Sequence, residues 1–118
     1  MKYLGFAFFL IFLNFGCSQN NSTSITEVSQ EELEQVVLID VRTPDEFHAG
    51  HLPNALNIDW LDVGFQQQVE ATVPKDKTIY VYCKSGGRSA KATEKLTALG
   101  YKVTDLTGGY DAYKNAQN

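Results

Sequence analysis

The feature that most constrains the fold is a short, uninterrupted apolar run, Val36-Val37-Leu38-Ile39, which ends at Asp40. A strand with one face in water alternates apolar and polar residues, whereas this run has no polar position and indicates a strand buried on both faces. A second run, Thr78-Ile79-Tyr80-Val81-Tyr82, is also strongly apolar and too short for a helix. We therefore predict an α/β fold with a small, mainly parallel sheet flanked by helices on both faces.

Segments with helical spacing or helix-start signals separate the predicted strands. Ser29 with Glu32, and Thr43 before Pro44, are such start signals, and Gly100 is placed to end a helix. The predicted strands are 25–28, 36–40, a short strand ending near 58, 78–82 and 101–106; the predicted helical segments are 30–35, a turn from 44, 59–73, 90–99 and 110–115. Ligands of parallel sheets bind beyond the carboxyl ends of the strands, so Asp40, Arg42 and Cys83 are expected to share one edge.

The stretch from Val81 to Ala90 is the candidate reactive site, because its thiol, Cys83, follows a strand and precedes a helix. Ser85, Gly86 and Gly87 let the backbone curl so that successive N–H groups point inward and form a cup for an anion. The helix N-terminus adds partial positive charge, and Arg88 and Lys84 add full charges. All of these favour a nucleophilic thiolate at Cys83. A small buried cysteine at the end of a strand is the alternative interpretation of the same residue.

The first residues indicate an export signal. Lys2 precedes an uncharged apolar run, 3–13, that is too short to span a membrane and is typical of a signal peptide covering 1–16. Gly16-Cys17 directly after the run resembles a bacterial lipoprotein signal, with Cys17 as the lipidated first residue of the mature chain; simple cleavage that leaves Cys17 free is the alternative. Residues 17–24 then form a polar tether, and 25–118 the folded domain.

This signal predicts a protein exported to the bacterial cell envelope, anchored in a membrane through its lipid and facing the periplasm or the cell exterior. Cys17 and Cys83 are the two cysteines of the chain, and we expect no disulfide because Cys17 lies on the tether. A lone thiol in an oxidising compartment is a liability unless chemistry requires it. The net charge of −4 argues against a nucleic-acid partner.

Together the segments from Ile25 onward resemble the rhodanese-like domain, specifically the single-domain sulfurtransferases. The order and spacing of four motifs carry the resemblance, whereas each motif alone is weak. They are Leu38-Ile39-Asp40-Val41-Arg42, Glu46-Phe47 with Gly50-His51-Leu52-Pro53-Asn54-Ala55, Cys83-Lys84-Ser85-Gly86-Gly87-Arg88-Ser89, and Leu106-Thr107-Gly108-Gly109-Tyr110.

The resemblance implies that Cys83 takes a sulfane sulfur from a small anionic donor such as thiosulfate and passes it to cyanide or a thiol, including the thiol of a thioredoxin-like protein. Lys84, Ser85, Gly86, Gly87 and Arg88 would bind the donor. It implies a monomer that needs no cofactor. Asp40 and Arg42 are expected to form a structural ion pair near the loop.

Three functions remain open at this stage. Related phosphatases place five residues between cysteine and arginine, whereas four separate Cys83 from Arg88, which favours sulfur transfer over phosphatase or arsenate reductase activity. A non-catalytic or redox-sensing binding module on the same fold is the other alternative. We expect structural or solvent-exposed roles, with no metal, for His48 and His51. Trp60 is expected either at the pocket mouth or in the core.

Overall fold

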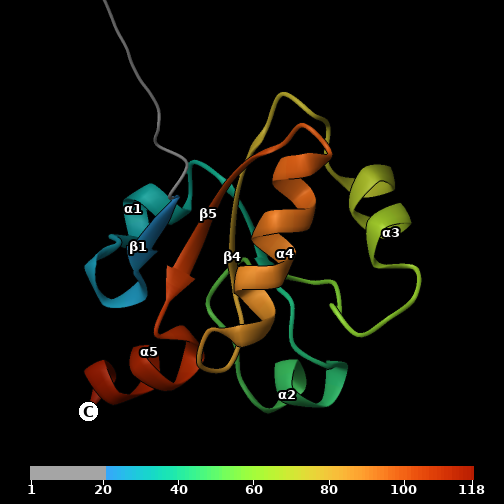
Figure 1. The fold of residues 1–118 in the computed structure, drawn as a ribbon. Coiled ribbons are helices and arrows are strands. Elements are labelled where there is room, and N and C mark those ends of the chain that lie inside the picture. Colours follow the sequence, from blue (N-terminus) through green and yellow to red (C-terminus); the bar gives the residue numbers. More distant parts are fainter. Residues whose placement is uncertain (1–20) are drawn as a thin grey trace, which may run out of the picture.

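The computed structural model describes residues 21–118, which form one five-stranded parallel sheet with helices on both faces (Figure 1). The predicted signal peptide, Cys17 and residues 18–20 of the predicted tether lie outside the described residues. The strand order across the sheet is β1-β5-β4-β2-β3. The strands are β1 (Ser22–Ser24), β2 (Val37–Asp40), β3 (Leu56–Asn57), β4 (Thr78–Tyr82) and β5 (Lys102–Thr107). The predicted fold class is therefore confirmed.

The helices follow the expected order along the chain. They are a 3₁₀ helix η2 (Ile25–Glu27), α1 (Gln30–Leu33), α2 (Pro44–Ala49), α3 (Phe65–Thr72), α4 (Gly87–Ala98) and α5 (Gly109–Gln117). No helix within residues 21–118 is both long enough and apolar enough to span a bilayer.

Two hydrophobic clusters lie on opposite faces of the sheet because neighbouring residues of a strand point in opposite directions. Ile39 and Val81 face the cluster built with α3 and α4, whereas Leu38 and Tyr82 face the cluster built with η2, α1 and α5. Both faces of β2 and β4 are thus covered, as their continuous apolar runs predicted.

The predicted first strand is wrong, because 25–27 forms the 3₁₀ helix η2 and the strand is β1, three residues earlier. The Ser24 hydroxyl accepts a hydrogen bond from the Thr26 N–H and caps η2, which places Ile25 in the core. β1 itself is polar and is specified by its backbone pairing with β5. Its sequence therefore has no hydrophobic pattern to reveal it.

The predicted helical segment 59–73 is shorter in the structure, where α3 begins only at Phe65. The carboxylates of Asp59 and Asp62 accept hydrogen bonds from the N–H groups of Leu61 and Gly64, and these turns replace the first helical residues. The turns leave Leu61 and Val63 largely exposed.

Candidate active site

The loop that leaves β4 carries Cys83, whose side chain is almost completely buried, with 1% exposure. The chain then turns through Lys84, Ser85 and Gly86 and enters α4 at Gly87. Gly86 has a φ of 142°, a conformation that other residues rarely adopt, so the tight turn depends on glycine there. The loop therefore holds the sulfur close to the first turn of α4.

Two polar groups contact the Cys83 sulfur. The Gly86 N–H donates to Sγ at 3.1 Å, and the Ser89 hydroxyl oxygen lies 3.4 Å from Sγ. Ser89 is fully buried, and its hydroxyl also donates to the Gly86 carbonyl at 3.2 Å. The Gly86 amide donor favours negative charge on the sulfur, whereas the Ser89 oxygen accepts a hydrogen bond from the Cys83 thiol.

The N-terminus of α4 supplies further donors. The N–H groups of Gly87 and Arg88 lie in the first turn of α4, where backbone N–H groups have no acceptor within the helix. No other acceptor for them occurs among residues 21–118. α4 has twelve residues and presents the positive end of its dipole to the loop. The arrangement is that of an anion site.

Arg88 is held in a bidentate ion pair by Glu46 of α2. The Arg88 nitrogens lie 2.8 and 3.0 Å from the two carboxylate oxygens. The hydrogen bonds from Arg88 are the main reason that the pKa of Glu46 falls to about 2. The same pair raises the pKa of Arg88, and the nearby Cys83 sulfur contributes in the same direction. Arg88 is thus fixed in position beside the thiol before any ligand binds.

Lys84 points elsewhere. Its ammonium group forms an exposed ion pair with Asp111 of α5 at 2.8 Å, and Lys84 is not among the residues that line the pocket at Cys83. Two N–H groups of α5 hold the backbone of the loop, since Tyr110 donates to the Cys83 carbonyl at 2.8 Å and Asp111 to the Lys84 carbonyl at 3.0 Å. The start of α5 therefore fixes the end of β4.

A pocket of about 350 Å³ opens over the sulfur. Trp60 and Leu61 form an apolar wall, whereas Arg88 and Lys91 bring two cations to it. The remaining lining residues are Cys83, Ser85 and Gly87. Trp60 also packs edge-on against Phe65 with ring centres 5.1 Å apart, so it serves both the pocket and the core.

Asp40 and Arg42 form the predicted ion pair at the end of β2, with 2.6 Å between Nη2 and Oδ2. Both side chains are buried. Burial alone would lower the pKa of Arg42, but the hydrogen bonds and the charge of Asp40 together raise it. Arg42 also donates to the Gly50 carbonyl at 2.7 Å and lies 4.4 Å from the centre of the Tyr110 ring. The pair thus joins β2, the end of α2 and α5 next to the loop.

The comparisons with known proteins agree with this geometry. The sequence pattern of the Rhodanese-like domain matches residues 25–116. The chain belongs to this family. It is 37% identical over 103 residues to Thiosulfate sulfurtransferase 16, chloroplastic, of Arabidopsis thaliana, a match that covers 79% of this chain and 86% of that protein.

Two further relatives support the family. A protein named Sulfurtransferase from Allochromatium vinosum is 34% identical over 97 residues, covering 75% of this chain and 88% of that protein. The crystal structure of a rhodanese-related protein from Thermoplasma volcanium has a TM-score of 0.72 and 28% identity, and the match covers 81% of this chain and 92% of that one.

Within this rhodanese-like domain, the structure brings most of the expected site residues together. Cys83, Ser85, Gly87 and Arg88 line one pocket, and the Gly86 N–H donates to the Cys83 sulfur. His48 and His51 lie on the exposed side of α2 and the following turn, where the His51 ring stacks on Phe47 at 3.7 Å.

Sequence reasoning missed the groups that position the site. Glu46 was identified only as part of a family motif, although its place three residues after Thr43 marks it as a capping residue. Lys91 and Leu61 were not identified as site residues, and Ser89 was identified only as part of the loop stretch. The predicted helix after the loop could have indicated Ser89 and Lys91. Both lie close to the start of that helix, and residues there face the loop that precedes it.

Proposed function

We propose that this rhodanese-like domain is a sulfurtransferase in which Cys83 carries the transferred sulfur as a persulfide. The observation that carries the proposal is the position of the Cys83 sulfur: it lines a pocket at a helix N-terminus and receives the Gly86 N–H at 3.1 Å. The relatives named as sulfurtransferases support the same chemistry. Thiosulfate is the donor we infer, and cyanide or a thiol is the acceptor.

Two displacements at sulfur complete the reaction. The Cys83 thiolate attacks the outer sulfur of thiosulfate, the S–S bond of the donor breaks, and sulfite leaves with the electron pair. Cyanide then attacks the outer sulfur of the persulfide, and the new S–S bond breaks to give thiocyanate and the starting thiolate. A thiol acceptor, small or on a thioredoxin-like protein, would take the same sulfur and become a persulfide.

The loop stabilises the charges that move during these steps. The Cys83 sulfur carries the negative charge before it attacks the donor and again after the acceptor has taken the outer sulfur. In the persulfide between these two steps, the outer sulfur carries the charge. Gly86, the free N–H groups of the first turn of α4 and the fixed Arg88 surround all of these positions. Lys91 lies in the same pocket and can attract the anionic donor.

We also propose export and lipid anchoring, supported by the apolar run 3–13 and by Cys17 after Gly16. Mass spectrometry of protein purified from the membrane fraction of its own cells tests this. A mature chain that begins at a diacylated Cys17 is the expected result. A mature chain that begins at an unmodified Cys17 would support export but contradict the lipid anchor.

The sulfur-transfer test combines turnover with detection of the intermediate. We expect the full-length chain to form thiocyanate from thiosulfate and cyanide, and intact mass after donor alone to show one added sulfur. Cys83→Ser should lose both signals, whereas the matched control Cys17→Ser should keep both. If several donors give neither adduct nor turnover, the domain is a binding module; aryl phosphate hydrolysis that depends on Cys83 would instead indicate a phosphatase.

A further inference from the structure

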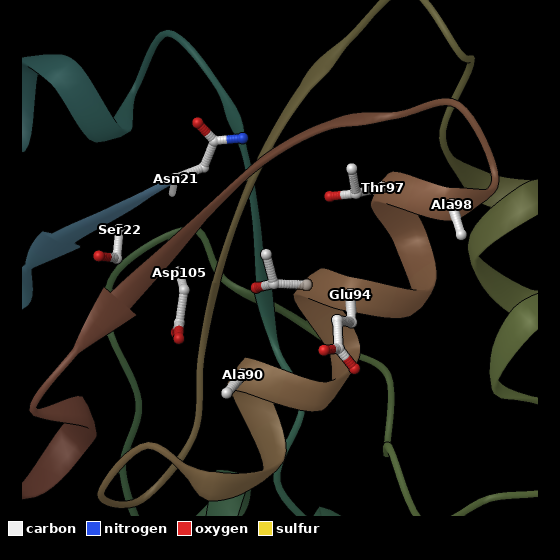
Figure 2. A pocket seen from close by; sticks show the side chains of 8 residues that line it. Asn21, Ser22, Ala90, Glu94, Thr97, Ala98 and Asp105 are labelled. Carbon is white, nitrogen blue, oxygen red and sulfur yellow. The ribbon is translucent and has the colours of Figure 1, made fainter. Parts of the chain in front are cut away.

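A second pocket lies between β1, β5 and one side of α4 (Figure 2). Its volume is about 540 Å³, larger than that of the pocket over Cys83. It is lined by Asn21, Ser22, Ala90, Thr93, Glu94, Thr97, Ala98 and Asp105. None of these residues lines the pocket at the sulfur, so the two are separate sites.

Asp105 is the unusual member of this lining. It is only 8% exposed, and its Oδ1 has no hydrogen-bond partner within residues 21–118. Figure 2 shows its side chain leaving β5 toward α4, on the side where Ala90 lies. Burial raises the pKa of Asp105, and the Ser89 hydroxyl only partly opposes this effect. A buried carboxylate with one oxygen unpartnered is costly, so such a group usually has a cation or a proton.

The other carboxylates around the loop each have their cation. These pairs are Asp40 with Arg42, Glu46 with Arg88, and Asp111 with Lys84. Asp105 lacks such a partner among the described residues, and no lysine, arginine or histidine lines its pocket. The missing positive charge can therefore come from a bound molecule.

The rest of the lining defines the chemistry of that molecule. Glu94 adds a second carboxylate at the exposed side, and the hydroxyls of Thr93 and Thr97 supply oxygen acceptors. Ala90 and Ala98 offer short apolar walls, and most of the accessible lining is carbon. We propose that this pocket binds a primary ammonium group on a short apolar stem, with the ammonium donating to the Asp105 carboxylate.

The proposal predicts how binding depends on pH. Asp105 faces Ser89 and Glu94 of α4, Asn21 and Ser22 of β1, and Val81 of β4, with the Cys83 thiol beyond Ser89. The ionisable groups among these neighbours are Glu94 and Cys83. An ammonium ion binds the ionised carboxylate, so affinity should rise with pH as Asp105 loses its proton, and binding at lower pH should release that proton.

The experiment titrates the full-length chain with n-butylammonium and follows the backbone amide signals of Asp105, Thr93 and Thr97 by NMR. We expect saturable shifts for n-butylammonium and none for n-butanol, which has the same stem without the charge. Asp105→Asn should weaken binding at least tenfold. Glu70→Gln, an exposed carboxylate on α3, is the matched control and should bind as the parent does.

A second variant separates binding from folding. Ala90→Leu keeps Asp105 but fills the pocket, and it should also abolish the shifts. Equal binding of n-butylammonium and n-butanol, unchanged binding in Asp105→Asn, or no saturable binding to the parent chain above neutral pH would each overturn the proposal. No sulfur donor is present in this assay, so its outcome is independent of the proposed sulfur transfer.

Discussion

The contact between Glu46 and Arg88 gives the most direct test of how the site is positioned. Glu46→Gln keeps the size of the side chain but replaces a carboxylate oxygen with an amide that faces the guanidinium. It also weakens the cap of α2, because the same carboxylate accepts the Thr43 N–H at 2.9 Å. We expect both losses to lower the free energy of unfolding.

The size of the loss follows from the pKa of Glu46, which falls from 4.5 to about 2 in the folded protein. A shift of that size corresponds to roughly 3.5 kcal/mol at most. The side chains of Arg88 and Glu46 are 25% and 29% exposed, so solvent screening reduces the expected loss to about 1–2 kcal/mol. For a domain of this length, that lowers Tm by roughly 5 to 15 °C.

The sign of the pH effect is also fixed. A carboxylate whose pKa is lowered by folding stabilises the protein above its unfolded value of 4.5, and this stabilisation disappears as the pH falls toward 2. The advantage of the parent chain over Glu46→Gln should therefore be full at neutral pH and shrink below 4.5.

Urea denaturation at neutral pH and at several acidic values measures both quantities. Asp45→Asn is the matched control, because Asp45 lies in the same first turn of α2 but is exposed and has no ion pair within residues 21–118. It should cost less than about 1 kcal/mol through the helix dipole. If Glu46→Gln costs no more than this control, or if its difference from the parent does not change with pH, the ion pair does not position Arg88 as described.

Three further substitutions test other contacts of the site and core. Gly109→Ala drives a methyl group into the Lys84 carbonyl oxygen and should destabilise the protein by about 3 kcal/mol or more. Gly100→Ala, also at positive φ but with open space around it, measures the backbone strain alone, and equal losses in urea would contradict the steric reasoning. Tyr101→Phe removes a 2.7 Å hydrogen bond to a buried carbonyl and should cost about 1–3 kcal/mol by thermal unfolding, and a loss near zero would contradict that contact. Lys84→Ala should cost less than about 1 kcal/mol because its ion pair is exposed, and a larger loss in urea would show that Lys84 supports the loop.

The sequence was sufficient to predict the sheet because its central strands carry a local signal. Val37–Asp40 and Thr78–Tyr82 are apolar on both faces, and both were predicted within one residue. The edge strand Ser22–Ser24 has no such signal, because its position depends on hydrogen bonds to β5, such as that from the Asp105 N–H to the Asn21 carbonyl. Pairing with a distant backbone leaves no hydrophobic pattern in the sequence of this edge strand.

The same distinction separates the predicted and missed parts of the site. The thiol and the glycines that surround it are contiguous, so their chemistry could be predicted from one segment. The ion-pair partners come from far along the chain: Glu46 lies 42 residues before Arg88, and Asp111 lies 27 residues after Lys84. Charge alone does not assign such partners, since many carboxylates compete for each cation.

These distant partners explain how so small a domain can hold a loop ready for anion chemistry. α2 fixes Arg88 through Glu46, and α5 fixes the Cys83 and Lys84 carbonyls through its first N–H groups. Arg42 joins the two supports, because it donates to the Gly50 carbonyl after α2 and lies over the Tyr110 ring of α5. The loop is therefore ordered when the protein folds, and donor binding does not have to bear the entropy cost of ordering it. More of the interaction energy can then stabilise the charged sulfur species. It follows that substitutions in α2 or α5 should slow the proposed sulfur transfer without touching the donor.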